Sequence, residues 1–266
     1  VKTMQSLISL NIGVANEYTS FGCNKKLVGC HDHRNPLTLP EAIQHSCNPY
    51  YYNLVKKIFF KGRNGNMAQL RKGMDDWEKY VRSFGLGNPL GVDLYGEKDG
   101  NVPDVKEYDQ IYGKNRWNYR TIYSLSIGQG EFSLTPIQMA NLGVILANKG
   151  YYYTPHLIRQ IGDEKLFFSD SNFYHKTLID SSNFEIVHNG MQWVLERPGG
   201  TAGRSKLEGV TICGKTGTSQ NPHGDDHSVF MAFAPRNNPQ IALAVFVENA
   251  GGGGGTAAPI ASLMIE

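Results

Sequence analysis

Apolar residues recur at helical spacing through most of the N-terminal part of the chain. The spacing predicts buried or amphipathic helices over residues 3–12, 70–84 and 184–194. Gly13 and Gly85 follow the first two of these segments, where glycine commonly ends a helix. The pattern therefore indicates a domain whose N-terminal part is mostly helical.

A second helical region is interrupted by a short polar loop. Pro40 opens a helix that continues through Ile43, and "SCNP" breaks it before "YYYNLVKKI" resumes the helical pattern. The residue before a proline avoids the helical region of backbone space. Ser46, Cys47 and Asn48 are therefore predicted to occupy a loop between two helices.

The clearest helix start lies in "LTPIQMANLGVILANKG". Thr135 is suited to the N-cap, Pro136 to the first helical position and Gln138 to a capping box. Gly150 marks the predicted end.

Towards the C-terminus the pattern changes to that of strands. "HSVFMAFAP" and "QIALAVFVEN" read as strands joined by the turn sequence "RNNP", and Thr211–Ser219 precedes them. Together they predict an antiparallel meander packed on helices, an α/β architecture in layers. We expect one domain over residues 1–266, with the helical part at about 1–200 and the main strands at about 208–249.

Composition changes this picture little but excludes some functions. The chain has 266 residues, 40% of them hydrophobic, and a formal net charge of +2 with no basic run, so no nucleic-acid partner is expected. The longest strongly apolar run, Ile241–Val247, is too short to span a bilayer. The abrupt start and the apolar end lead us to expect that both ends were cut within a longer protein.

Three short motifs occur in one order along the chain. A lysine, Lys2, lies in the first predicted helix; Ser46 and Asn48 form S-x-N; and Lys215 begins K-T-G. Each motif alone is weak, since K-T-G by itself is most often a turn without function. S-x-x-K, S-x-N and K-T-G in this order are the known signature of penicillin-binding proteins and serine β-lactamases.

The resemblance extends beyond the three motifs. Longer stretches that cover nearly the whole chain are similar to the transpeptidase domain of class B penicillin-binding proteins, most of all the elongation-type members: "SIGQGEFSLTPIQMANLGVILANKG", "RPGGTAG", "GKTGTSQ" and "MAFAPRNNPQIALAVFVEN". It implies a β-lactamase/transpeptidase-like fold, in which an antiparallel sheet is flanked by helices and joined to a mostly helical subdomain.

The resemblance also implies an activity and its partners. Such a domain is expected to cross-link peptidoglycan stem peptides through a serine acyl-enzyme, using a D-Ala-D-Ala donor, and to be acylated by β-lactam antibiotics. No cofactor is required for this chemistry. The full-length protein is expected to be anchored in the bacterial inner membrane with this domain on the periplasmic face, and to work with a SEDS-family glycosyltransferase.

One position departs from the expected motif. If Lys2 is the lysine of S-x-x-K, the nucleophilic serine stands two positions before Val1, outside this sequence. Because loss of such a nucleophile costs on the order of 10⁶ in rate, we expect the chain as given to be inactive.

The first two motifs carry the expected acid–base chemistry. A lysine one helical turn from a serine lies on the same helix face and can take its proton if burial and a nearby positive charge lower the pKa. Lys215 could supply that charge. By resemblance, Ser46 relays protons to the leaving amine and Asn48 bonds the substrate's amide.

The third motif carries the expected binding of the acyl donor. By resemblance, Thr216 and Thr218 bind the substrate's carboxylate, and Gly217 leaves room for the acyl chain along the strand edge. The backbone N–H of Thr218 would form an oxyanion hole with that of the serine. Losing one such donor typically costs about 10²–10³ in rate.

The cysteines leave two interpretations open. Cys23 and Cys30 could form a disulfide, or the cysteines could stay reduced beside surface histidines; alternatively, Cys23, Cys30, His33 and Cys47 could hold a structural zinc ion with the Cys₃His ligand set. His31 is the alternative histidine. We lean towards zinc, because Cys47 lies inside the S-x-N motif and a metal there would tie the Cys23–Cys30 loop to it.

"GQG" at residues 128–130 is read as a tight turn near the cleft. By composition the glycines at 251–255 could be a flexible linker, whereas the family resemblance implies a turn into a C-terminal helix beginning near Ala257. A class A β-lactamase is disfavoured, because "EKDGN" has glycine where E-x-x-L-N has leucine. A non-catalytic β-lactam-sensing or scaffold domain of the same fold stays open.

Overall fold

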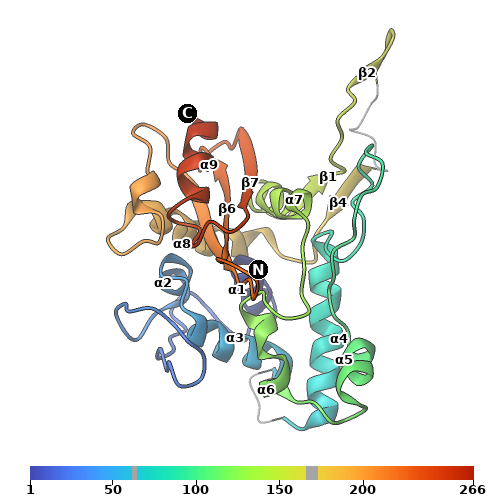
Figure 1. Ribbon diagram of the computed structural model, residues 1–266, viewed down its shortest axis with the longest axis vertical. Helices are drawn as coiled ribbons and strands as arrows, with labels where there is room; N and C mark the ends of the chain where they lie inside the picture. The colour runs from blue at the N-terminus through green and yellow to red at the C-terminus, as the bar shows by residue number, and fades with distance from the viewer. Residues whose placement is uncertain (62–64, 166–172) are drawn as a thin grey trace.

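The computed structural model describes residues 1–61, 65–165 and 173–266. Its main sheet (Figure 1) is antiparallel, in the order β5-β6-β7, and consists of β5 (Cys213–Ser219), β6 (His227–Ala234) and β7 (Ile241–Val247). The register pairs Thr218 with Ser228 and Ser228 with Val247. The predicted meander is confirmed, and β5 has one edge that pairs with no strand in the described part of the chain.

Three helices cover this sheet: α7 (Pro136–Ala147), α8 (Phe184–Glu196) and α9 (Ala257–Ile265). Figure 1 shows the sheet between α9 and α7, and α8 packs against β5. A Cβ on Gly143 of α7 would lie 3.4 Å from the carbonyl oxygen of Ala232, which shows how closely α7 approaches β6. The glycines at 251–255 form the loop from β7 into α9, as the family resemblance implied.

The helical part contains α1 (Lys2–Asn11), α2 (Leu39–Gln44), α3 (Asn48–Phe60), α4 (Met67–Ser83), α5 (Val105–Tyr112), α6 (Tyr119–Ile122) and the 3₁₀ helix η1 (Tyr123–Ser126). Helix α1 is buried from Thr3 to Leu10. Its Gln5 accepts a hydrogen bond from Trp77 Nε1 (2.8 Å) and donates to the Leu125 carbonyl (3.2 Å). These buried contacts fix α1, and with it the position of Lys2.

Local capping explains where several helices begin. Thr135 Oγ1 accepts the backbone N–H of Gln138 (3.3 Å), so the predicted capping box of α7 is confirmed. Asn66 and Gln69 form an equivalent box, with bonds of 3.1 and 2.9 Å, and start α4 earlier than the predicted residue 70. No helix in residues 1–61, 65–165 and 173–266 has the length and apolarity needed to cross a membrane.

Among the described residues, two small sheets lie outside the main one. They pair β1 (Tyr151–Tyr153) with β4 (Tyr174–Lys176), and β2 (Gln160–Ile161) with β3 (Glu164–Lys165). The ring of Tyr152 is buried and stacks on His175 at 4.7 Å between centroids. Strand β2 lies at the end of an arm that extends away from the main sheet in Figure 1. The hydrophobic pattern gave no signal for these short strands.

Candidate active site

A cleft of about 700 Å³ lies between the helical part and the main sheet. Lys2 enters it from the start of α1, and Ser46 from the turn between α2 and α3. Asn48 was predicted to lie in this loop but is the first residue of α3, because Cys47 is the N-cap and Pro49 suits the first turn of a helix. The 127–134 segment and the edge of β5 complete the walls. The fold therefore brings all three sequence motifs into one cavity.

Lys2 makes the densest set of contacts in the cleft. Its Nζ donates to the Ser46 carbonyl (2.7 Å), to Ser46 Oγ (2.9 Å) and to Asn48 Oδ1 (2.6 Å). Burial lowers the pKa of Lys2 to about 8. At neutral pH roughly one tenth of the amine is thus free to accept a proton.

The cause of this lowered pKa differs in part from the sequence-based expectation. Burial lowers the pKa of Lys2, as predicted, but the charge of Lys215 is not among the causes, and the thiols of Cys30 and Cys47 oppose the shift. The electrostatic effect is instead that of Lys2 on the pKa of Lys215. Burial, followed by the charge of Lys2, lowers the pKa of Lys215 well below its usual value.

The turn that carries Ser46 has an unusual backbone. Ser46 has φ of 52°, in the left-handed region, which costs a non-glycine residue about 1–3 kcal/mol. Backbone bonds from Ser46 to Ile43 and from Cys47 to Ala42, both 3.2 Å, hold it there. With this backbone conformation, both the carbonyl and the hydroxyl oxygen of Ser46 lie within hydrogen-bonding distance of Lys2 Nζ.

Asn48 connects the cleft to the cysteine-containing loop behind it. Its Oδ1 accepts from Lys2, and its Nδ2 donates to the carbonyl of Gly29 (2.8 Å). Both ends of the amide are therefore occupied, and the position of Asn48 depends on the loop that contains Gly29.

The opposite wall is built on β5. Lys215 is 7% exposed, and its Nζ donates to the Thr216 carbonyl (2.9 Å). Thr216 Oγ1 lies 2.7 Å from Thr201 Oγ1, in the "GTAG" turn. A Cβ on Gly253 would lie 2.5 Å from the Gly217 carbonyl oxygen, so glycine at position 253 allows the loop after β7 to pack on this strand.

Comparison with known proteins identifies the family. The model of the penicillin binding protein transpeptidase domain matches residues 1–266. The chain belongs to this transpeptidase family.

Individual relatives agree with this assignment. The chain is 33% identical over 235 residues to peptidoglycan D,D-transpeptidase MrdA of Escherichia coli K12, covering 82% of this chain and 35% of that protein. It resembles Pseudomonas aeruginosa PBP2 with a TM-score of 0.80 at 31% identity, over 100% of this chain and 57% of the other. A peptidoglycan synthase complex that coordinates polymerization and crosslinking matches at 26% identity and a TM-score of 0.78, over 99% and 44%. The chain spans about a third of the length of its curated relatives.

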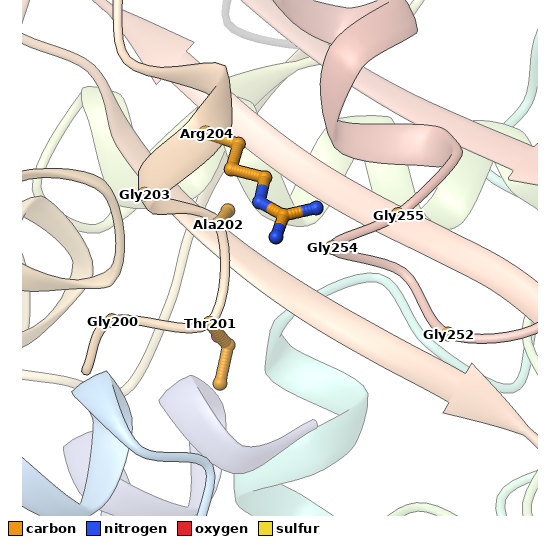
Figure 2. Close-up of a pocket in the computed structure, with 8 residues that line it drawn as sticks. All are labelled: Gly200, Thr201, Ala202, Gly203, Arg204, Gly252, Gly254 and Gly255. Carbon is orange, nitrogen blue, oxygen red and sulfur yellow. The ribbon is translucent and has the colours of Figure 1, made fainter.

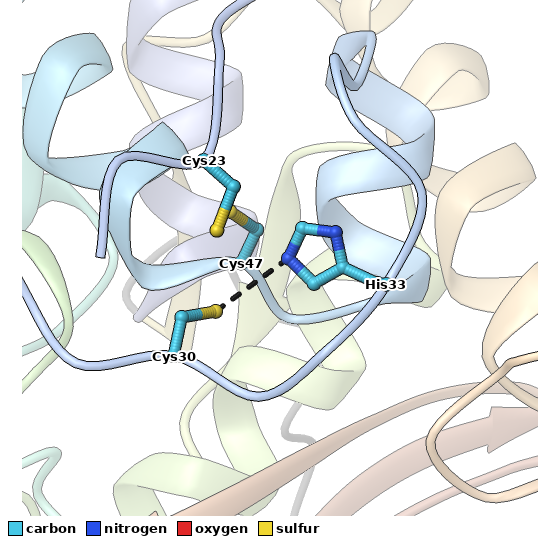
Figure 3. A group of neighbouring side chains, drawn as sticks. All are labelled: Cys23, Cys30, His33 and Cys47. Carbon is cyan, nitrogen blue, oxygen red and sulfur yellow. Dashed lines mark hydrogen bonds between the residues drawn. The ribbon is translucent and has the colours of Figure 1, made fainter.

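Behind the cleft of this transpeptidase domain, four side chains converge (Figure 3): Cys23, Cys30, His33 and Cys47. Their sulfur and nitrogen atoms all lie within 4.8 Å of one another. In tetrahedral zinc sites the Zn–S distance is about 2.3 Å, which places sulfurs roughly 3.8 Å apart. All four cysteines are free thiols, so Cys23 and Cys30 form no disulfide.

Hydrogen bonds around this cluster suit metal ligands. Nδ1 of His33 lies 2.7 Å from the Arg34 carbonyl, which leaves Nε2 facing Cys30 Sγ at 3.5 Å. A hydrogen bond from Cys47 lowers the pKa of Cys30, and the backbone N–H of Asn48 acts in the same direction. The donor set and its spacing fit zinc, with His33 as the predicted histidine, whereas His31 lines the cleft.

A second hollow of about 510 Å³ adjoins the cleft at Thr201 (Figure 2). The "GTAG" turn and the glycine loop after β7 line it. Figure 2 shows Arg204 reaching from this turn towards Gly254. A Cβ on Gly254 would lie 2.1 Å from the Thr201 carbonyl oxygen, so the glycine loop lies this close to the "GTAG" turn only because residue 254 has no side chain.

The structure brings together every residue that the motifs singled out and adds two others. Thr201 belongs to a stretch noted only for its family resemblance. Gln129 was read as part of a tight turn near the cleft; that reading is correct, but its side chain also donates to the Thr218 carbonyl (2.8 Å). Neither contact has a signal in the local sequence, because each joins segments distant along the chain.

Proposed function

We propose that this chain is the acyl-transfer domain of a peptidoglycan D,D-transpeptidase that cross-links stem peptides and binds penicillin. The observation that carries the proposal is the meeting of Lys2, Ser46 and Asn48 with the Lys215–Thr218 strand in one cleft. The name of the E. coli relative, a D,D-transpeptidase, supports it.

In the proposed reaction, the nucleophile is the serine expected three residues before Lys2. Its oxygen attacks the carbonyl of the penultimate D-alanine, and neutral Lys2 accepts its proton. As the C–N bond to the terminal D-alanine breaks, Ser46 Oγ, 2.9 Å from Lys2 Nζ, passes a proton to the leaving amine and takes up the proton that Lys2 holds. An amine of a second stem peptide then attacks the ester carbonyl and gives a proton to neutral Lys2. The C–O bond to the serine breaks, and Lys2 returns the proton to the serine oxygen.

The strand wall would bind and polarise the donor. Lys215, Thr216 and Thr218 would hold the terminal carboxylate, and the backbone N–H of Thr218 would stabilise the tetrahedral oxyanion. Gly217 would leave the strand edge accessible to the acyl chain. A β-lactam would enter the same cleft and acylate the same serine.

The wider setting is part of the proposal. We infer that the full-length protein acts at the periplasmic face of the inner membrane beside a SEDS-family glycosyltransferase. The similarity to a peptidoglycan synthase complex that coordinates polymerization and crosslinking supports a polymerising partner.

The test uses the full-length protein and a synthetic pentapeptide that ends in D-Ala-D-Ala. We expect D-alanine release, dimeric peptide when an acceptor amine is present, and loss of both after preincubation with penicillin. Binding of penicillin without D-alanine release would favour a sensor domain instead. A folded protein that neither binds penicillin nor releases D-alanine would contradict the proposal.

We also propose a structural zinc ion at Cys23, Cys30, His33 and Cys47. When bound, it would crosslink the loop before α2 to the S-x-N turn. Asn48 connects the same loop to Lys2 through Gly29, so an ordered loop would help hold the acid–base network.

Metal content tests this second proposal without reference to activity. Full-length protein purified without chelator should contain one zinc per chain by mass spectrometry, and Cys30→Ser should lose it. Cys213→Ser is the matched control, because Cys213 is a buried free thiol outside the cluster and should retain zinc. A folded wild-type protein without zinc, or equal zinc in both variants, would contradict the assignment.

A further inference from the structure

The side chain of Gln129 reaches across the cleft to the strand wall. Its Nε2 donates to the carbonyl oxygen of Thr218 at 2.8 Å, although the two residues are 89 positions apart. Both residues line the cleft. The contact thus lies in the space that a substrate would enter.

The turn that carries Gln129 is tightly determined. Gly128 and Gly130 have φ of 77° and 76°, a region that favours glycine. A Cβ on Gly130 would lie 2.5 Å from Ser124 Oγ, and the backbone N–H of Gln129 donates to the Ser124 carbonyl (3.0 Å). The backbone therefore holds Gln129 in place, and its side chain is the part that can move.

The carbonyl that Gln129 occupies belongs to the open edge of β5. In an antiparallel pair, alternate residues direct both backbone groups away from the partner strand. The Thr216 carbonyl accepts a hydrogen bond from Lys215, and the Thr218 carbonyl accepts one from Gln129. Thr216 and Thr218 therefore present their backbone groups on the edge of β5 that faces away from β6. Thr218 thereby offers an acceptor for an incoming main-chain N–H.

An extended peptide that binds beside an edge strand uses such acceptors. Main-chain hydrogen bonds supply much of the affinity in this mode of recognition. The donor stem peptide has amide N–H groups on the acyl side of its reacting carbonyl, as an acylamino β-lactam has in its side chain. In the free protein, Gln129 supplies the N–H to Thr218 instead.

We propose that Gln129 gates the strand edge: its side-chain amide occupies the Thr218 carbonyl in the free protein and must leave when a donor with an amide N–H binds. The inference rests on the proposed acyl-transfer function. It makes Gln129 a specificity-determining residue, because only ligands that require the Thr218 carbonyl must displace it.

Two β-lactams distinguish an effect of Gln129 on the Thr218 carbonyl from an effect on the rest of the site. Benzylpenicillin has an acylamino N–H, whereas a carbapenem with a hydroxyethyl side chain has none. Second-order acylation rates are measured with both on the full-length protein, as wild type, Gln129→Ala and Gln129→Met. Methionine has a similar length and no charge, and its thioether cannot donate a hydrogen bond. Gln110→Ala, at an exposed position on α5, is the control.

The expected result is a selective gain for benzylpenicillin. Removing one hydrogen-bonding competitor should raise its acylation rate constant about twofold to tenfold in both Gln129 variants and leave the carbapenem rate unchanged. The carbapenem also reports whether each variant is folded and reactive.

The other outcomes would overturn the inference. An equal change for both β-lactams would assign Gln129 to the fold or to the serine chemistry. A selective loss for benzylpenicillin would mean that Gln129 helps to bind the amide. Failure of wild type to react with either compound would count against the proposed function itself, independently of Gln129.

Discussion

The two walls of the cleft are built in different ways. The helical wall, formed by Lys2, Ser46 and Asn48, is a network of side-chain hydrogen bonds of 2.6 to 2.9 Å. The strand wall, formed by residues 215–218, offers mainly backbone groups along an open edge, and glycines lie against it. One wall is suited to moving protons, and the other to holding an extended chain.

This difference predicts how each wall responds to substitution. Removing a side chain from the helical wall removes a reacting group or its direct partner, so rate should fall steeply. Removing a side chain from the strand wall leaves the backbone donors in place, so the loss should be modest and appear mainly in binding. The predictions below follow that order.

Lys2→Ala should have the largest effect. Without the base, the acylation rate constant of the full-length protein with a fluorescent penicillin should fall about 10²–10⁴-fold in a stopped-flow measurement. Lys106→Ala, an exposed lysine of α5, should react as wild type does. A fall of less than tenfold for Lys2→Ala would show that another group is the base.

Asn48→Ala should have the second-largest effect on the acylation rate. It removes an acceptor of Lys2 and the bond to Gly29, and a hydrogen bond to a charged group contributes about 1.5–3 kcal/mol, so acylation should slow roughly 10- to 150-fold. The matched control is Asn53→Ala, further along α3, whose Nδ2 donates to the carbonyl of Pro49 outside the cleft. Equal effects of the two substitutions would indicate damage to α3 rather than to the network.

The pH dependence sharpens the role assigned to Lys2. Its pKa is lowered to about 8, and only the neutral amine accepts a proton, so acylation should rise about tenfold from pH 7 to pH 9 and then level. The titratable groups near Lys2 include Lys215, whose pKa is also lowered, the thiols of Cys30 and Cys47, and Tyr51, whose ring centroid lies 5.6 Å from Lys2 Nζ. In Asn48→Ala the ammonium loses an acceptor, so the midpoint should move to lower pH. A rate independent of pH over this range would contradict the assignment.

Thr216→Val tests the strand wall and should have the smallest effect. It removes the bond to Thr201 but leaves the backbone of β5 unchanged. We expect binding of penicillin before acylation to weaken about two- to tenfold, with the limiting acylation rate nearly unchanged. A loss as large as that of Lys2→Ala, confined to the limiting rate, would break the distinction between the walls.

Local chemistry in the sequence accounts for most of the fold. Thr135 and Gln138 predicted the start of α7, and the apolar runs within 227–235 and 240–249, joined by a turn sequence, predicted β6 and β7. The short strands β1 to β4 gave no such signal, because two or three residues are too few for a periodic pattern. Their pairing depends on tertiary contacts such as Tyr152 on His175.

The cleft also contains both features that the sequence predicted and features that it did not. The motifs singled out Lys2, Ser46 and Lys215, and the structure places all three in one cleft; their roles in acyl transfer stay a prediction. The motifs did not predict the contact of Gln129 with Thr218, which depends on where the fold places a turn against a strand edge. The cause of the lowered pKa of Lys2 was also only partly predictable, since burial is set by the packed structure.

The most direct test of the account is to locate the penicillin adduct. Full-length protein is labelled with penicillin, digested, and analysed by peptide mass spectrometry. We predict a single adduct on the serine three residues before Lys2, with none on Ser46. An adduct on Ser46, or on any residue outside this cleft, would contradict the assignment of Lys2 as base and Ser46 as proton relay.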